Sequence, residues 1–220
     1  MLLPHRLALL TLAWLGLAAT APSADSESRT FSVAVDGKAA GSCRMTVQKR
    51  PDGTLAVTAR ADVSVKVAIL TYKYTYRGTE VWKDGRLHSL ESNADDNGKK
   101  HSVSATGGHD GAVFRSAGRE VFVRGDVWLT TYWQLPPEKA RGPTLALVDA
   151  DTGKSLNAKL EKVGPDEVPV AGNVVKATRY RVSGAVKVDL WYDNSDRLVR
   201  QESVEDGHKT VLELTRLERD

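Results

Sequence analysis

Histidines and acidic residues are the side chains of this sequence that could catalyse a reaction or hold a metal ion. Outside the N-terminal segment the histidines are His88, His101, His109 and His208. His101 and His109 flank a predicted hairpin with Asp110 beside it, so an acid–base pair or a metal site there is one hypothesis. Asp95 and Asp96 lie on the preceding turn, where turn geometry alone favours Asp, and solvated loop residues are the preferred interpretation. The sequence holds no nucleophile elbow, phosphate loop or dinucleotide fingerprint, and it predicts no catalytic residue, metal ligand or cofactor.

Eight aromatic residues give a stronger indication, and it is of binding. Three of them alternate along one predicted strand and therefore share a face. Core packing is the ordinary role of such residues. The functional hypothesis is an apolar cavity between a curved sheet and a helical lid, which is the usual character of a small-molecule site. The residues expected to line that cavity are Tyr72, Tyr74, Tyr76, Trp82, Trp128, Tyr132, Trp133 and Trp191.

Charge and cysteine content limit the classes of function. Without the N-terminal segment, which contributes Arg6, the chain has 30 basic and 28 acidic residues. These charges form no long block or basic stripe, so no nucleic-acid partner is expected. Cys43 is the single cysteine and alternates with apolar neighbours, which predicts a small buried side chain rather than a reactive thiol.

Alternation of apolar and polar residues dominates the chain and predicts antiparallel strands. Hairpin turns recur between the alternating segments, as at Asp84-Gly85 and Asn97-Gly98. One apolar parity continues from Leu55 to Ile69, which predicts either a bent strand or an unusually long, curled one. The parity then changes, as a bulge or tight turn at residues 69–71 would cause.

The segment 126–135 departs from this pattern. Its aromatic residues are spaced at i, i+4 and i+5, Asp126 could cap a helix, and Pro136-Pro137 would end it. This predicts a short helix packed on the sheet. The expected fold class is therefore mainly β: a single curved antiparallel sheet or half-barrel with one short helix on its concave side.

The N-terminus has the parts of a secretory signal. A short basic start is followed by an apolar run from Leu7 to about Ala21 and by small residues near a cleavage point. The run is too short for a convincing membrane span. We therefore expect a signal peptide over residues 1–24, a single antiparallel β domain over residues 25–220, and an exported protein that is periplasmic or secreted.

Two parts of the chain resemble a known family. They are Glu80-Val81-Trp82-Lys83-Asp84-Gly85-Arg86-Leu87 followed by Asp96-Asn97-Gly98, and Asp189-Leu190-Trp191-Tyr192-Asp193 followed by Arg197-Leu198-Val199. On these segments the chain resembles an uncharacterised family of exported bacterial proteins, catalogued as a domain of unknown function, over nearly all of its mature part. That resemblance implies no catalytic residues. At the level of fold, the long strands are also similar to the β-clam of periplasmic lipoprotein carriers, an open half-barrel over a lipid-binding cavity, but fold does not imply function.

Three functions remain open, and they predict different arrangements. The leading hypothesis is non-enzymatic binding of a lipid, an acyl chain or another apolar small molecule in a β-clam cavity. The first alternative is an envelope scaffold or assembly protein that contacts another envelope protein through exposed strand edges. The second is a hydrolase or metal-dependent enzyme, which requires His101, His109 and nearby acids to converge in one cleft. The oligomeric state is left open.

Overall fold

A computed structural model describes residues 25–67, 70–141, 144–205 and 207–220. The predicted signal peptide, residues 1–24, lies outside them. The first eight strands are β1 (Ser26–Val35), β2 (Lys38–Lys49), β3 (Leu55–Val67), β4 (Leu70–Lys83), β5 (Arg86–Asp96), β6 (Lys99–Gly107), β7 (Gly111–Ser116) and β8 (Arg119–Arg124). They are followed by β9 (Trp128–Leu129), the 3-10 turn η1 (Glu138–Ala140), β10 (Leu145–Val148), β11 (Ser155–Val170), β12 (Asn173–Gly184), β13 (Val188–Asp193), β14 (Leu198–Glu205) and β15 (His208–Arg219).

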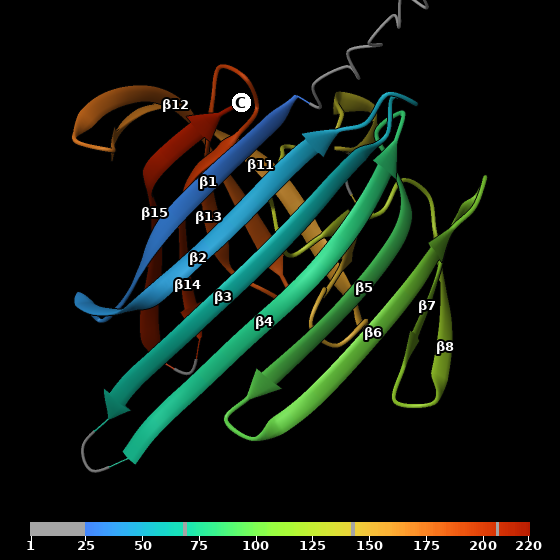
Figure 1. The fold of residues 1–220 in the computed structure, drawn as a ribbon, viewed down its shortest axis with the longest axis horizontal. Coiled ribbons are helices and arrows are strands. Elements are labelled where there is room, and N and C mark those ends of the chain that lie inside the picture. Colours follow the sequence, from blue (N-terminus) through green and yellow to red (C-terminus); the bar gives the residue numbers. More distant parts are fainter. Residues whose placement is uncertain (1–24, 68–69, 142–143, 206) are drawn as a thin grey trace, which may run out of the picture.

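All these strands belong to one sheet, in the order β8-β7-β6-β5-β4-β3-β2-β1-β15-β14-β13-β12-β11-β10-β9. The pairs are antiparallel except for β9 with β10, which run parallel. The sheet curves, so that β1–β6 form a front wall with β11, β13 and β14 behind it (Figure 1). Its edges, β8 and β9, do not pair with each other. The predicted fold class, a single curved sheet or half-barrel, is confirmed, and the parallel pair makes the sheet mixed.

The long run of one parity is a single strand. β3 pairs with β4 without a register shift, from Leu55 opposite Trp82 to Val67 opposite Leu70. Because the two strands are antiparallel, odd positions of β3 lie opposite even positions of β4, and this explains the change of parity. The chain therefore reverses where a bulge or tight turn was predicted; of residues 69–71 in that prediction, residue 69 lies outside the described residues.

The predicted helix at residues 126–135 is wrong. Trp128 and Leu129 form β9 beside Leu147 and Val148 of β10. The chain then turns at Tyr132, whose φ is +48°. Within the described residues, the helical piece of the chain is η1, which follows the two prolines.

Hydrogen bonds to distant strands replace helical ones in this segment. Arg29 donates to the Trp133 carbonyl, the Tyr192 hydroxyl donates to the Tyr132 carbonyl at 3.0 Å, and the Leu135 N–H donates to the Asp196 carbonyl at 3.1 Å. Aromatic and β-branched residues, which have modest helix propensity, make up much of the segment. These contacts join both halves of the sheet, so residues 126–141 and 144–151, here called the inner segment, lie inside the curve.

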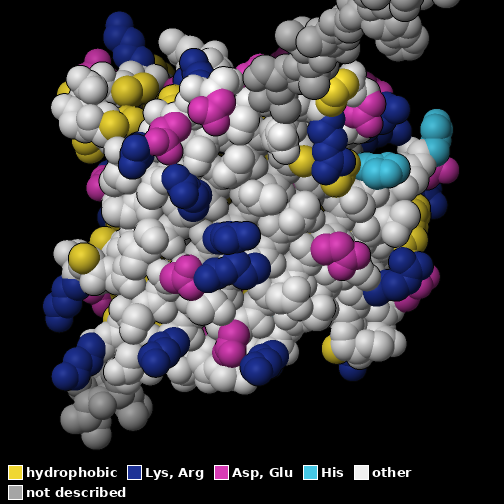
Figure 2. Space-filling view, viewed as in Figure 1, with side chains coloured by type: hydrophobic (Ala, Val, Ile, Leu, Met, Phe, Trp, Pro, Cys, Tyr) yellow, Lys and Arg dark blue, Asp and Glu magenta, His cyan; other side chains and the backbone are white. Residues whose placement is uncertain are grey.

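The inner segment and the concave face together form one apolar core. Its fully buried side chains include Phe31, Leu90, Phe114, Leu147 and Leu190. The outward face of the front wall is different: Figure 2 shows charged side chains of both signs on it and few hydrophobic ones. In the described part of the chain no helix has the length and apolar character to cross a membrane.

Candidate functional site

One face of β4 carries aromatic and acidic side chains at alternate positions. Tyr72, Tyr74, Tyr76, Glu80 and Trp82 share the inward face of this strand; we call them the inner row. Exposure falls along the row, from 39 % at Tyr72 to 5 % at Tyr76 and 1 % at Glu80. The row therefore leads from the solvent-exposed end of the half-barrel into its core.

Glu80 is a carboxyl group buried in the core. The Thr131 hydroxyl donates to its Oε1 at 2.6 Å, and the Trp82 indole N–H donates to its Oε2 at 2.7 Å. Burial raises the pKa of Glu80 to about 7, although the polar hydrogens of Thr131, Trp82 and Trp133 act to lower it. The carboxyl thus joins β4 to the inner segment and titrates near neutral pH.

Asp151, the last residue of the inner segment, is a second carboxyl group in contact with the inner row. It accepts a hydrogen bond of 2.7 Å at Oδ2 from the Tyr74 hydroxyl. Burial, and then the charge of Asp149, raise the pKa of Asp151 to about 6, while the Tyr74 hydrogen bond lowers it. Tyr74 is accordingly the donor that supports the ionised form of Asp151.

We expect Tyr74→Phe to destabilise the protein by about 1–3 kcal/mol at pH 8, because the partly buried carboxylate of Asp151 loses a donor. The loss should shrink at pH 5, where Asp151 is protonated and needs the donor less. Urea unfolding at both pH values measures this. Tyr72→Phe is the matched control, since its bond to Asp96 (2.6 Å) is at an exposed position; an equal loss in both variants would contradict the expectation.

Tyr76 occupies space that only a glycine leaves free. A Cβ atom on Gly78 would lie 2.2 Å from the Tyr76 hydroxyl oxygen, so the tyrosine side chain lies across Gly78. Among the described residues that hydroxyl has no hydrogen-bond partner. The nearby Ser92 hydroxyl donates instead to the Ala150 carbonyl at 2.6 Å. The interior of the inner row is thus packed rather than hollow around Tyr76.

Most of the remaining predicted aromatic residues pack against one another. Trp133 contacts Trp82 edge to face, with ring centroids 6.0 Å apart, and Trp128 contacts Tyr132 with centroids 4.9 Å apart. All four are buried. The structure therefore brings these four and the inner-row tyrosines to the same concave side.

Trp191 is not part of this group. It lies on β13 between Leu190 and Tyr192, which face the core, so alternation directs it to the opposite face of the sheet. There the guanidinium groups of Arg179 and Arg200 lie 5.0 and 5.5 Å from its ring centroid. Its N–H donates to Asp166 of β11 at 2.8 Å.

The strands β2 and β3 separate at one end of the half-barrel (Figure 1). Their pairing reaches Gly41 opposite Val63 and stops there, although both strands continue. A Cβ atom on Gly41 would lie 2.0 Å from the Asp62 carbonyl oxygen, so a glycine permits this close approach. The register of β1 with β2 shifts at the same level. The resulting opening has a volume of about 550 Å³ and is lined by Lys38, Ala39, Ala40, Ser64, Val65 and Lys66; we call it the splay groove.

The splay groove combines apolar side chains with free positive charge. Ala40 is buried and Val65 is half-buried, whereas Lys38 and Lys66 are exposed. In the described part of the chain neither lysine takes part in an ion pair. Val65 lies directly opposite Tyr72, so the groove adjoins the exposed end of the inner row.

The histidines do not converge. His101 lies near the start of β6, opposite Ala94, and His109 lies beyond its end, roughly 20 Å away along an extended strand. His109 is exposed and pairs with Asp110 at 2.8 Å. Among the described residues no group of three or more His, Cys, Asp or Glu side chains is arranged to hold a metal ion.

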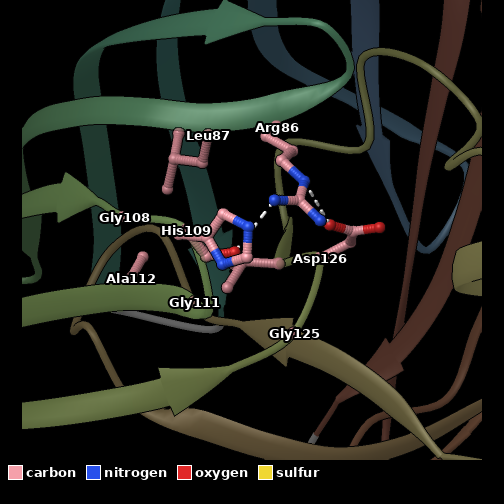
Figure 3. A pocket seen from close by; sticks show the side chains of 9 residues that line it. Arg86, Leu87, Gly108, His109, Gly111, Ala112, Gly125 and Asp126 are labelled. Atoms are coloured by element: carbon pink, nitrogen blue, oxygen red, sulfur yellow. Dashed lines mark hydrogen bonds and ion pairs between the residues drawn. The ribbon is translucent and has the colours of Figure 1, made fainter.

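A small pocket lies beside His109 (Figure 3). Arg86 crosses it, donating to the His109 carbonyl at 2.9 Å and pairing with Asp126 at 2.9 Å. Its volume is about 10 Å³, which suits no more than one water molecule. Arg86 therefore ties the β6–β7 connection to the start of the inner segment, and the arrangement is structural.

Sequence reasoning missed the polar residues that matter most. Glu80 could have been found, because it has the parity of the inner-row tyrosines and a carboxyl on an inward face is unusual. Asp151 reads as a turn residue in Ala150-Asp151-Thr152-Gly153, and its burial depends on the inner segment. Lys38 and Lys66 look like ordinary surface lysines until the separation of β2 and β3 brings them to one groove.

Comparisons with known proteins concern the family and the fold. A family model described as a domain of unknown function, DUF6134, matches residues 31–215, which confirms the resemblance to a family of that kind. A comparison with curated proteins finds no match.

Two solved structures are similar to this chain to different degrees. A β-barrel-like protein of the domain of unknown function DUF1849 from Brucella abortus has a TM-score of 0.59 at 10 % identity, over 90 % of this chain and 98 % of that chain. This shows a shared fold. A putative outer membrane lipoprotein-sorting protein domain from Vibrio parahaemolyticus has a TM-score of 0.23 at 8 % identity, over 89 % and 85 % of the two chains. That score is too low to support an inference.

Proposed function

The chain belongs to the DUF6134 family, a domain of unknown function, and on that premise we propose that it binds an acyl chain with an acidic head group in the splay groove. The observation that carries this proposal is an apolar floor, Ala40 and Val65, between two lysines that form no ion pair within 4 Å among the described residues. Its volume of about 550 Å³ is in the range of small-molecule sites.

The proposal places the ligand in the groove rather than among the predicted aromatic residues. Trp82 is buried against Trp133, and Trp128 is buried against Tyr132. A ligand there would have to displace these side chains. Tyr72 is the member of the predicted set that stands next to the groove, opposite Val65. We therefore keep the hypothesis of an apolar ligand, but we propose that it binds at the open end of the half-barrel instead of among the buried aromatic residues.

The groove is shallow, and the expected affinity is modest. Each buried methylene contributes about 0.8 kcal/mol, so roughly five of them contribute about 4 kcal/mol. The cost of association offsets much of this gain. The two lysines add attraction for an anionic head at the exposed rim, where salt screens it. We place this binding in the cell envelope, because the N-terminus has the form of a secretory signal.

Titration calorimetry with two probes of equal chain length tests the proposal. Decanoate should bind in the millimolar range, and decyltrimethylammonium should bind at least about tenfold more weakly, because its head repels the lysines. Lys38→Glu/Lys66→Glu should reverse this preference. Lys176→Glu, an exposed charge reversal on β12, is the control and should leave it unchanged. Equal binding of both probes, or no effect of the double reversal, would refute the proposal.

A further inference from the structure

The strand β8 is an open edge of the sheet with apolar side chains on both faces. It pairs with β7 alone. Val121 is 44 % exposed and Phe122 is 53 % exposed, and Val123 is the buried residue of the strand. The opposite edge, β9, is two residues long and both are buried. Unpaired backbone groups on an exposed edge accept a further strand readily.

We propose that β8 pairs antiparallel with β8 of a second copy of this chain, about a two-fold axis that passes through Phe122. In this register each Glu120 lies opposite the other copy's Arg124, and this ion pair occurs twice. Val121 lies opposite Val123, and the two Phe122 rings meet at the axis. Residues directly opposite in an antiparallel pair share a face and interact, so all of these pairs are favourable.

Other registers lose this complementarity. An axis between Val121 and Phe122 is excluded, because it would set residues of opposite faces, such as Arg119 and Arg124, against each other. An axis at Val121 places Glu120 opposite Phe122, which leaves the carboxylate without a cationic partner across the strand. The alternation of charge in Arg119-Glu120-Val121-Phe122-Val123-Arg124 therefore selects a second copy of the same strand and one register.

The charged groups are free to make these contacts. Arg124 forms no ion pair within the part of the chain that the structure describes. The Nε–H of Arg115 on β7 donates a hydrogen bond of 2.8 Å to Glu120 Oε2. The other carboxylate oxygen, Oε1, is left for the partner. Arg115 and Glu120 stand opposite each other on β7 and β8, so the pairing would extend an existing ladder of charges.

Sedimentation equilibrium on the whole chain, with charge-reversed variants, tests the register. The protein should dimerise reversibly. Glu120→Arg and Arg124→Glu should each weaken the dimer at least about tenfold, because each creates two pairs of like charges. The double variant Glu120→Arg/Arg124→Glu should restore dimerisation. Arg60→Glu, an exposed charge reversal on β3, should have no effect.

Three results would overturn the inference. The first is a monomer at every concentration at which the protein is soluble. The second is a dimer that both single variants leave intact, since that dimer would use another surface. The third is a double variant no better than either single one, provided that circular dichroism shows all variants folded; this would exclude the proposed register.

Discussion

Replacing Glu80 with Gln is expected to stabilise the protein at pH 8 by up to about 3 kcal/mol and to change its stability little at pH 5. Burial raises the folded-state pKa of this carboxyl to about 7, against 4.5 for a glutamate in water. The folded protein therefore binds more protons than the unfolded chain between these pH values. Stability falls as the pH rises through this window, and above pH 7 the full cost of the buried charge is present.

The amide of Gln can keep both contacts that Glu80 makes. Its oxygen can accept from the Trp82 indole, and its nitrogen can donate to the Thr131 hydroxyl. Urea unfolding at pH 5 and pH 8 measures the difference, with Glu91→Gln on the exposed side of β5 as the control. A Gln variant that is less stable than the parent at pH 8 would show that the ionised carboxylate stabilises the inner segment.

Trp133→Ala is expected to destabilise the protein by about 3–5 kcal/mol, the usual cost of removing a buried Trp side chain. Trp133 is 6 % exposed and packs edge to face on Trp82. Its removal would leave a cavity between β4 and the inner segment. Chemical unfolding measures the loss, and Tyr72→Ala, at a position 39 % exposed, should cost far less.

The same variant separates two interpretations of the aromatic residues. If Trp133 lined an open ligand cavity, its truncation would weaken ligand binding while the stability changed little. The packed arrangement predicts the reverse: a large loss of stability, and decanoate binding unchanged at a temperature where the variant is folded. A stability change below about 1 kcal/mol would contradict a packed core at this position.

The alternation along the chain was enough to predict the sheet, because side-chain parity depends only on local sequence. The run from Leu55, the reversal after it and the last strands all appear in the structure as strands. Cys43 is buried as its parity predicted, and burial raises the pKa of its thiol to about 12. These features require no knowledge of distant contacts.

The inner segment could not be predicted in this way. Its aromatic spacing fits a helix, yet distant partners, among them Arg29 and Tyr192, provide its hydrogen bonds. The same long-range packing partly buries Asp151. The splay groove depends on where β2 and β3 separate. Gly41 permits this separation, but a single glycine in the sequence does not predict it.

The most direct test of the groove is an amide and methyl NMR titration of the protein with decanoate. Binding in the splay groove predicts shift changes that saturate together at Ala39, Ala40 and Val65, extend to Tyr72, and leave Trp82 and Trp133 unperturbed. Shift changes centred on the buried aromatic residues would move the site into the core. No saturating change anywhere would contradict the proposal that this protein binds acidic acyl chains.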